Sequence, residues 1–188
     1  MPLIDVPQRS PEWFAARQGK ITASLAAAIL GVDPHKGPLA AYNAIVLEKK
    51  ETENKHMAWG VEFEQAAREA YEVASGRFVT ETSFWVHELW PWFGASPDGL
   101  IGDDGLVEIK CPGTCPEAIP EPHVVQMRVQ MAVVGRDWCD YFAWSQNWQF
   151  LRLLEREPAV EMEIMTALDV FYHEHILPKV PPPRRRSK

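Results

Sequence analysis

The pattern of apolar and polar positions predicts a helical first third of the chain. A helix is expected over residues 10–17, with Ser10 as its N-cap and Pro11 in its first turn. A second helix over 22–30 ends at Gly31, and a third covers 39–49. Apolar or small residues recur close to the helical period in a fourth helix, at positions 59, 63, 66, 67, 70, 71 and 74 of the range 57–74.

The pattern changes after Arg77 to short apolar runs that proline and glycine interrupt. These runs predict strands at 78–80, 84–86 and 92–95, followed by a hairpin that reverses at Gly102–Gly105. A helix over 122–134, strands at 141–144 and 150–154, and a closing helix over 158–175 complete the pattern. We therefore expect an α/β (α+β) fold with a central mixed β-sheet flanked by helices. One domain would cover 1–178, and 179–188 would form a flexible basic tail.

Composition is consistent with one packed domain, because 46% of the 188 residues are hydrophobic and eight are tryptophan. No stretch approaches the roughly 18 consecutive apolar residues of a membrane helix, so we expect a cytoplasmic protein without membrane contact. Three cysteines without a C-x-x-C pair argue against a disulfide framework, a zinc site and an iron–sulfur cluster. The histidines form no metal-binding motif, and we interpret them as surface or packing residues.

The net charge of −7 is unusual for a protein that handles nucleic acid. Its distribution matters more than its sum, because carboxylates grouped around divalent ions become attractive to phosphate once the ions are bound. A path for DNA would use the basic residues Arg9, Arg17, Lys20, Lys36, Arg128, Arg136 and Arg184–Arg186.

The segment S-P-D-G-L-I-G-D-D-G-L-V-E-I-K at 96–110 carries the candidate chemistry. Strand alternation sends Glu108 and Lys110 to one face while Ile109 is buried on the other, and the hairpin brings Asp98 beside Glu108. Two carboxylates aimed at one point bind Mg²⁺, with Mn²⁺ as a substitute, and such an ion can activate water against a phosphate. Lys110 would orient or deprotonate that water, or offset the charge of the phosphate. A solvated hairpin without chemistry is the alternative interpretation of these fifteen residues.

Four sequence blocks in order give the chain a family resemblance. They are R-Q-G-K-I-T-A-S at 17–24, A-W-G-V-E-F-E at 58–64, S-P-D-G-L with E-I-K-C-P at 96–100 and 108–112, and a glutamine-bearing helix at 123–131. Over roughly residues 10–145 the chain resembles the phage lambda exonuclease and YqaJ viral recombinase family of PD-(D/E)xK nucleases. The resemblance implies a restriction-endonuclease-like core.

The resemblance implies four metal ligands: the side chains of Glu64, Asp98 and Glu108, and the main-chain carbonyl of Ile109. Glu62 competes with Glu64 for this role. Since the two residues point about 200° apart on a helix, only one of them can face the site. The spacing of the W-G-x-x-x-E motif favours Glu64.

The resemblance also makes Lys110 the catalytic lysine and Gln126 the glutamine that helps to hold the site and the attacking water. Gln130, one turn later on the same face, is the fallback for Gln126. Arg128 stands where the family often has a second glutamine, which leaves the details of this helix open.

Arg17, Ser24 and Ser96 match family positions that form a pocket for a 5′-terminal phosphate, and a guanidinium with hydroxyl donors suits such an anion. The resemblance thus implies a Mg²⁺-dependent 5′-to-3′ exonuclease. It would digest one strand of linear double-stranded DNA from 5′-phosphorylated ends and leave 3′ single strands for phage-type recombination. It further implies a ring-shaped homotrimer, a single-strand annealing protein as partner, and a phage or prophage origin in a bacterial host. An endonuclease of the same superfamily and a non-catalytic DNA-binding module are the alternatives.

Overall fold

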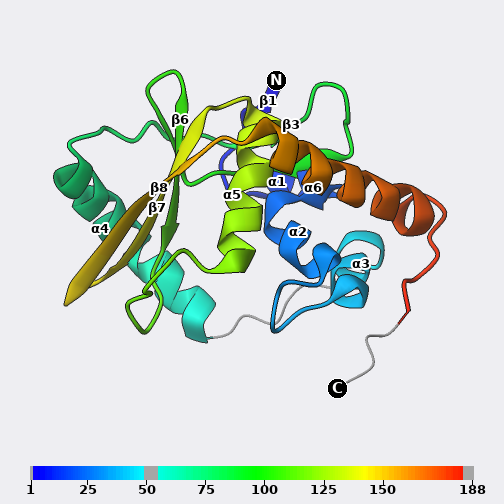
Figure 1. Ribbon diagram of the computed structural model, residues 1–188, viewed down its shortest axis with the longest axis horizontal. Helices are drawn as coiled ribbons and strands as arrows, with labels where there is room; N and C mark the ends of the chain where they lie inside the picture. The colour runs from blue at the N-terminus through cyan, green and yellow to red at the C-terminus, as the bar shows by residue number, and fades with distance from the viewer. Residues whose placement is uncertain (1, 49–54, 184–188) are drawn as a thin grey trace.

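The computed structural model describes residues 2–48 and 55–183, with side chains from Phe63 onward in the second range. Its helices are α1 Pro11–Arg17, α2 Ala23–Leu30, α3 Pro38–Val46, α4 Lys55–Ser75, α5 Glu121–Val134 and α6 Pro158–Phe171, which continues as the π-helix η1 Tyr172–Ile176 (Figure 1). Its strands are β1 Leu3–Ile4, β2 Ile21–Thr22, β3 Phe84–Val86, β4 Phe93–Ala95, β5 Gly99–Ile101, β6 Gly105–Lys110, β7 Trp138–Ser145 and β8 Trp148–Glu155.

The strands form two mixed sheets of four strands each, rather than the single central sheet that the sequence led us to expect. One sheet has the order β1-β3-β4-β2, and in it only β2 and β4 run parallel. The other has the order β5-β6-β7-β8, with β6 and β7 parallel between two antiparallel pairs. The expected α/β class with flanking helices is confirmed.

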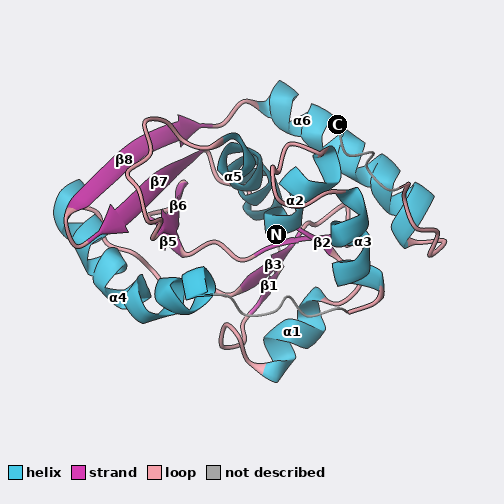
Figure 2. Ribbon diagram, turned by 90° about the horizontal axis from the view of Figure 1, so that it is seen from below, coloured by secondary structure: helices cyan, strands magenta, loops and turns pink. Residues whose placement is uncertain are grey.

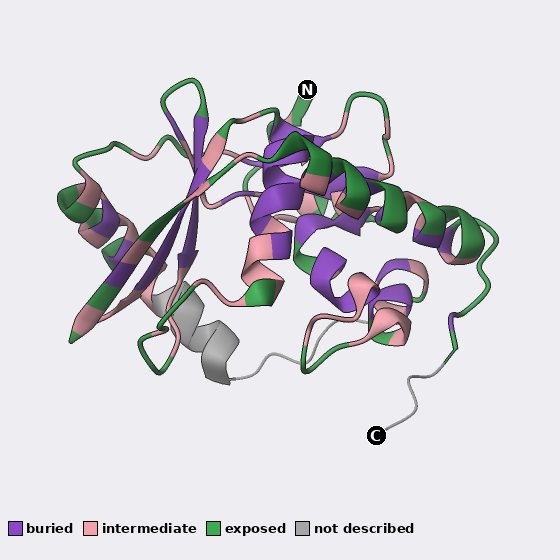
Figure 3. Ribbon diagram, viewed as in Figure 1, coloured by how far each residue is buried: buried purple, intermediate pink, exposed green. Residues whose placement is uncertain are grey.

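Helix α5 lies between the two sheets and unites them. It contacts β3 and β4 of one sheet and β7 of the other, and also packs on α2 and α6 (Figure 2). Nine of the ten residues of α5 from Val125 to Val134 are buried, so this helix is the centre of the larger core (Figure 3). A smaller core lies on the opposite face of β6 and β7, under α4.

Local chemistry explains the predicted helix boundaries. The Ser10 hydroxyl accepts a hydrogen bond from the backbone N–H of Trp13 at 3.1 Å and so caps α1. Gly31 ends α2 in the left-handed conformation, with φ at 75°. The predicted strand at 78–80 is reduced to one bridge between Thr80 and Leu100.

The end of the described chain lies against the domain. Tyr42 donates a hydrogen bond to the Lys179 carbonyl at 2.8 Å, and Pro182 is buried. The predicted arginine run at 184–186 falls outside the described residues. None of the helices in the described ranges combines the length and apolar character of a membrane span.

Candidate active site

The β5–β6 hairpin assembles the first part of the site. Asp98 immediately precedes β5, and Gly99 pairs with Val107 across the hairpin. The backbone N–H of Ile109 donates to the Asp98 Oδ2 atom at 2.7 Å. The hairpin therefore brings Asp98 to the part of β6 that carries Glu108, as the sequence predicts.

Strand alternation on β6 places apolar side chains on the face under α4 and Glu108 on the face toward α5. Val107 and Ile109 enter the smaller core under α4, while Leu106 enters the larger core on the α5 side. Glu108 faces α5 with Leu106, and it is only 1% exposed. Burial of a carboxylate is costly unless its oxygens accept hydrogen bonds, so its partners define what the site can do.

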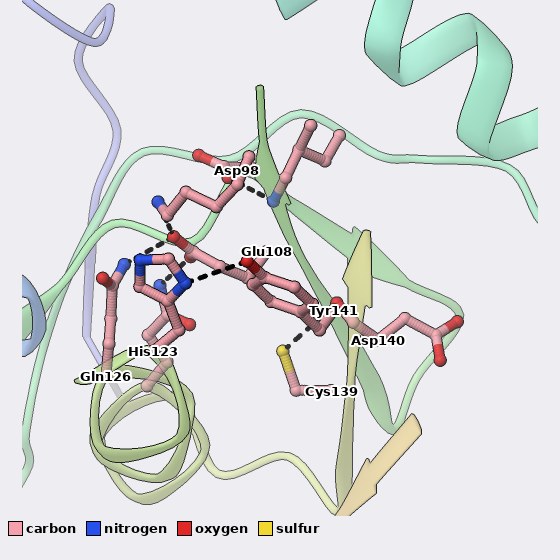
Figure 4. Close-up of polar contacts among 10 residues, drawn as sticks. Asp98, Glu108, His123, Gln126, Cys139, Asp140 and Tyr141 are labelled. Carbon is pink, nitrogen blue, oxygen red and sulfur yellow. Dashed lines mark hydrogen bonds and ion pairs between the residues drawn. The ribbon is translucent and has the colours of Figure 1, made fainter. Parts of the chain in front are cut away.

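Three donors surround the buried Glu108 carboxylate (Figure 4). Lys110 pairs with Oε1 from the same face of the strand. Gln126 donates to Oε1 and Gln130 to Oε2, each from its Nε2 atom at 2.6 Å. The two glutamines lie one turn apart on α5, so the predicted glutamine and its fallback both reach the same group.

Arg128 lies on another side of α5 and takes no part in this network. It is 7% exposed and forms an ion pair with Glu157, the residue just before α6. The departure from the usual second glutamine therefore serves the packing of α5 on α6.

Negative charge accumulates around Asp98. Its burial, together with the neighbouring charges of Glu108 and Glu64, raises the pKa of the Asp98 carboxyl to about 7, although Lys110 and the Ile109 N–H act in the opposite direction. For Lys110, burial alone would lower the pKa, but the charges of Glu108 and Asp98 outweigh it and raise the pKa above the usual value. These charges therefore favour the protonated form of Lys110.

Glu64 comes to the site from α4. It lines a cavity of about 620 Å³ together with Asp98, and its Oε2 atom accepts a hydrogen bond from Arg9 at 2.7 Å. The side chain of Glu62 lies outside the described residues, so the structure places Glu64 without testing its competitor. For Ile109 the structure records the N–H bond to Asp98, and the role of its carbonyl stays a prediction.

The donor set of this site fits a hard divalent cation in kind. Asp98, Glu108 and Glu64 supply carboxylate oxygens, and burial together with the charges of Glu108 and Glu64 raises the pKa of the Asp98 carboxyl. Within the described part of the chain, however, no three acidic, histidine or cysteine side chains are close enough together to hold an ion as they stand. In the structure Glu108 is bonded to Lys110 and two glutamines, and Glu64 is paired with Arg9.

The predicted phosphate-binding residues lie together only in part. Arg17 donates to the Ser96 hydroxyl at 3.3 Å, and its guanidinium lies 4.0 Å from the centre of the Trp13 ring. Burial lowers the pKa of Arg17 to about 10, which still leaves it charged near neutral pH. Ser24 is exposed, and its recorded bond is to Thr22 at 3.2 Å.

The parallel pairing of β2 with β4 nevertheless places Ser24 and Ser96 at the carboxyl ends of two adjacent strands. Thr22 is opposite Gly94 in this pair, so Ser24 and Ser96 each follow two residues later at the same end of adjacent strands. Ser24 also lies in the first turn of α2, where free backbone N–H groups favour anions.

Sequence reasoning gave no functional role to a further pair beside the site. The His123 Nδ1 and Tyr141 Oη atoms are 2.9 Å apart, and Tyr141 is opposite Glu108 in the β6–β7 register (Figure 4). Burial and the nearby Lys110 charge lower the pKa of His123 to about 4, so its ring is neutral. The only sequence signal was the position of His123 one turn before Gln126 on the same helix.

Comparison with known proteins identifies the family of the chain. Residues 12–137 match the model of the YqaJ-like viral recombinase domain, and the chain belongs to that family. An alkaline exonuclease from Laribacter hongkongensis has 34% sequence identity to the chain and superimposes with a TM-score of 0.79, covering 91% of this chain and 94% of the exonuclease. The structure of the same exonuclease in complex with dAMP gives a TM-score of 0.80 at the same identity.

More distant similarities are found in one solved structure and in one viral sequence. A phage-related exonuclease from Haemophilus somnus 129PT is 15% identical and superimposes with a TM-score of 0.63, over 82% of this chain and 94% of that one. The uncharacterized protein R354 of Acanthamoeba polyphaga mimivirus is 26% identical over 71% of this chain. The matched part covers only 28% of that viral protein. The fold is the restriction-endonuclease-like fold of alkaline exonucleases.

Proposed function

We propose that this protein is a Mg²⁺-dependent 5′-to-3′ exonuclease that digests one strand of double-stranded DNA from 5′-phosphorylated ends. The observation that carries the proposal is the convergence of Asp98, Glu108 and Lys110 at one end of the β5–β6 hairpin, where burial and neighbouring carboxylates raise the pKa of Asp98 to about 7. The likeness to an alkaline exonuclease over nearly the whole chain supports the same class of reaction. The dAMP bound to that relative supports a deoxynucleoside monophosphate as product.

Asp98, Glu108 and Glu64, with the Ile109 carbonyl, would hold Mg²⁺. When bound, the ion supplies an activated water and neutralises charge on the scissile phosphate. A protonated Lys110 suits stabilisation of phosphate charge and orientation of the water better than proton removal.

Gln126 and Gln130 have a positioning role in this proposal. Each donates to a different oxygen of Glu108, so together they fix the plane of the carboxylate. A fixed carboxylate aims its lone pairs at one point, which is a requirement of a metal ligand. His123 and Tyr141 support the same region of the sheet, because Tyr141 is the neighbour of Glu108 in register.

The 5′-phosphate pocket of the proposal consists of Arg17, Ser96 and Ser24. Arg17 already contacts Ser96, and stacking on Trp13 restricts its guanidinium to a narrow range of orientations. A terminal phosphate would accept hydrogen bonds from this guanidinium and from the two hydroxyls at the common edge of β2 and β4. The pocket would make the enzyme specific for DNA ends.

Family membership supports a wider context for the reaction. We extend the proposal to a ring-shaped homotrimer around the duplex and to a single-strand annealing protein that receives the 3′ strand. Recombination of this kind fits the viral recombinase domain to which the chain belongs.

The test uses three matched duplexes in Mg²⁺: linear with 5′-phosphates, linear with 5′-hydroxyls, and covalently closed circular. We expect preferential loss of the 5′-phosphorylated strands and an intact circle. Cleavage of the circle would identify an endonuclease instead. Equal digestion from 5′-phosphorylated and 5′-hydroxyl ends would contradict the proposed phosphate pocket. Binding to DNA without any cleavage would leave a non-catalytic module.

A substitution tests the role of the lysine. Lys110→Ala is expected to abolish cleavage while binding of 5′-phosphorylated duplex persists, because Lys110 acts on the reacting phosphate and not on the pocket at Arg17. Cleavage at the unaltered rate would remove the lysine from the mechanism.

A further inference from the structure

Arg9 has an unusual backbone conformation at the edge of the candidate metal site. Its φ is 67°, in the left-handed region that is sterically unfavourable for a residue with a Cβ. Both neighbours hold it there. Gln8 donates to the carbonyls of Thr82 at 3.0 Å and Pro97 at 3.4 Å, and Ser10 caps α1. Strain that the surroundings maintain in this way is typical of functional sites.

Among the described residues, the recorded partner of the Arg9 side chain is Glu64, a candidate metal ligand. The Nη2 atom lies 2.7 Å from the Oε2 atom of Glu64, and the two side chains are 52% and 30% exposed. Asp98 lines the same cavity. The cavity also contains a second arginine, Arg68, but this residue pairs with Glu81 instead.

We propose that Arg9 is a positioning residue that serves as the resident counter-ion of Glu64 and that a divalent cation must displace. The inference rests on the proposed function, because it takes Glu64 to be a metal ligand. A guanidinium has no lone pair for a metal, so it and the ion compete for the carboxylate. In the exchange one N–H···O bond breaks, the ion releases one water ligand and gains one bond to a Glu64 oxygen, and the arginine keeps its proton and turns to solvent.

Competition from Arg9 raises the concentration of divalent cation that is needed to occupy the site. Ion pairs that are partly exposed contribute about 0.2–1 kcal/mol, and 1.36 kcal/mol corresponds to a factor of ten. Removing the competitor is therefore expected to tighten metal binding by up to about fivefold. Because Arg9 lies next to the site but would not ligate the metal, the effect should appear in equilibrium binding without DNA.

The experiment measures equilibrium binding of Mn²⁺ to the full chain by calorimetry or by the electron paramagnetic resonance signal of free Mn²⁺. Arg9→Gln and Arg9→Gly are both expected to lower the dissociation constant, by up to about fivefold. The glycine variant suits the left-handed backbone, so it keeps the test valid if the glutamine variant folds poorly. Arg9→Lys retains a charge within reach of Glu64 and should bind as the unaltered protein does.

Arg68→Gln is the matched control, because it removes the same charge from the same cavity while its partner is Glu81. It should leave the dissociation constant unchanged, and an equal tightening would show a general field effect and overturn the proposal. The same holds if both Arg9 variants bind Mn²⁺ no more tightly than the unaltered protein.

A double-mutant cycle links the effect to the carboxylate. In a Glu64→Gln background, Arg9→Gln should no longer change Mn²⁺ affinity, and a persisting change would refute the competition for Glu64. Absence of any Mn²⁺ binding by the unaltered protein would overturn the proposed metal-dependent function itself. Binding that is insensitive to Arg9 would overturn this inference alone.

Discussion

Asp98→Asn is expected to stabilise the metal-free protein while abolishing cleavage. The pKa of Asp98 is about 7 in the folded protein against 3.8 for an ordinary aspartate, a difference of about 3 pH units. At about 1.4 kcal/mol for each unit, ionisation of Asp98 costs the folded state about 4 kcal/mol above pH 7. Asp98 is only half-buried, so solvent reduces the expected gain to about 2–4 kcal/mol.

The sign of the pH dependence follows from the raised pKa. Between about pH 4 and pH 7 the folded state binds the proton that the unfolded state has lost, so the stability of the unaltered protein falls as pH rises through this range. Asparagine cannot ionise, and its amide oxygen still accepts the Ile109 N–H. The advantage of the variant should therefore be largest at pH 8 and less than half as large at pH 5.

Urea unfolding in EDTA at the two pH values measures the free energy of unfolding. Added Mg²⁺ provides the complementary control, because it should stabilise the unaltered protein more than the variant. A variant that is less stable than the unaltered protein at pH 8 would contradict the reasoning. An equal gain at both pH values would also contradict it, since the gain would then not come from the charge of Asp98.

Three further predictions concern the supports of the site. Gln130→Ala removes a buried donor to Glu108 and should lower the free energy of unfolding, measured by thermal unfolding, by about 1–3 kcal/mol, and it should also lower kcat. Unchanged values of both would show that the donor is dispensable. Gly94→Ala should destabilise the protein by about 1–3 kcal/mol, since a Cβ there would lie 2.1 Å from the Phe84 ring; denaturant unfolding checks this, and a neutral result would mean that the ring moves aside freely. Arg17→Lys keeps the charge but loses the planar fork, so the preference for 5′-phosphorylated over 5′-hydroxyl duplex should fall severalfold in a competition digest, and a retained preference would exclude Arg17 from the pocket.

Local sequence signals were sufficient for most elements. Capping by Ser10 and the left-handed Gly31 fixed helix ends that depend on neighbouring residues alone. The hairpin at Gly102–Gly105 and the alternation along β6 likewise predicted that Asp98 approaches Glu108. Strands β1 and β2 have two residues each, which is too short for any periodic signal. Strand β1 pairs with β3 and β2 pairs with β4, and each partner lies at least 70 residues away along the chain.

The sequence by itself determined the residue types of the candidate site and the turn that brings two of its carboxylates together, because hairpins and capped helices are specified over a few residues. Only the tertiary structure decided that Gln126 and Gln130 share Glu108, that Arg128 turns to Glu157, and that Arg9 meets Glu64. These pairings depend on how α5 packs near β6 and α6, and on how the segment before α1 lies against α4. Such packing is set by the burial of many side chains from distant segments, so no single stretch of sequence contains it.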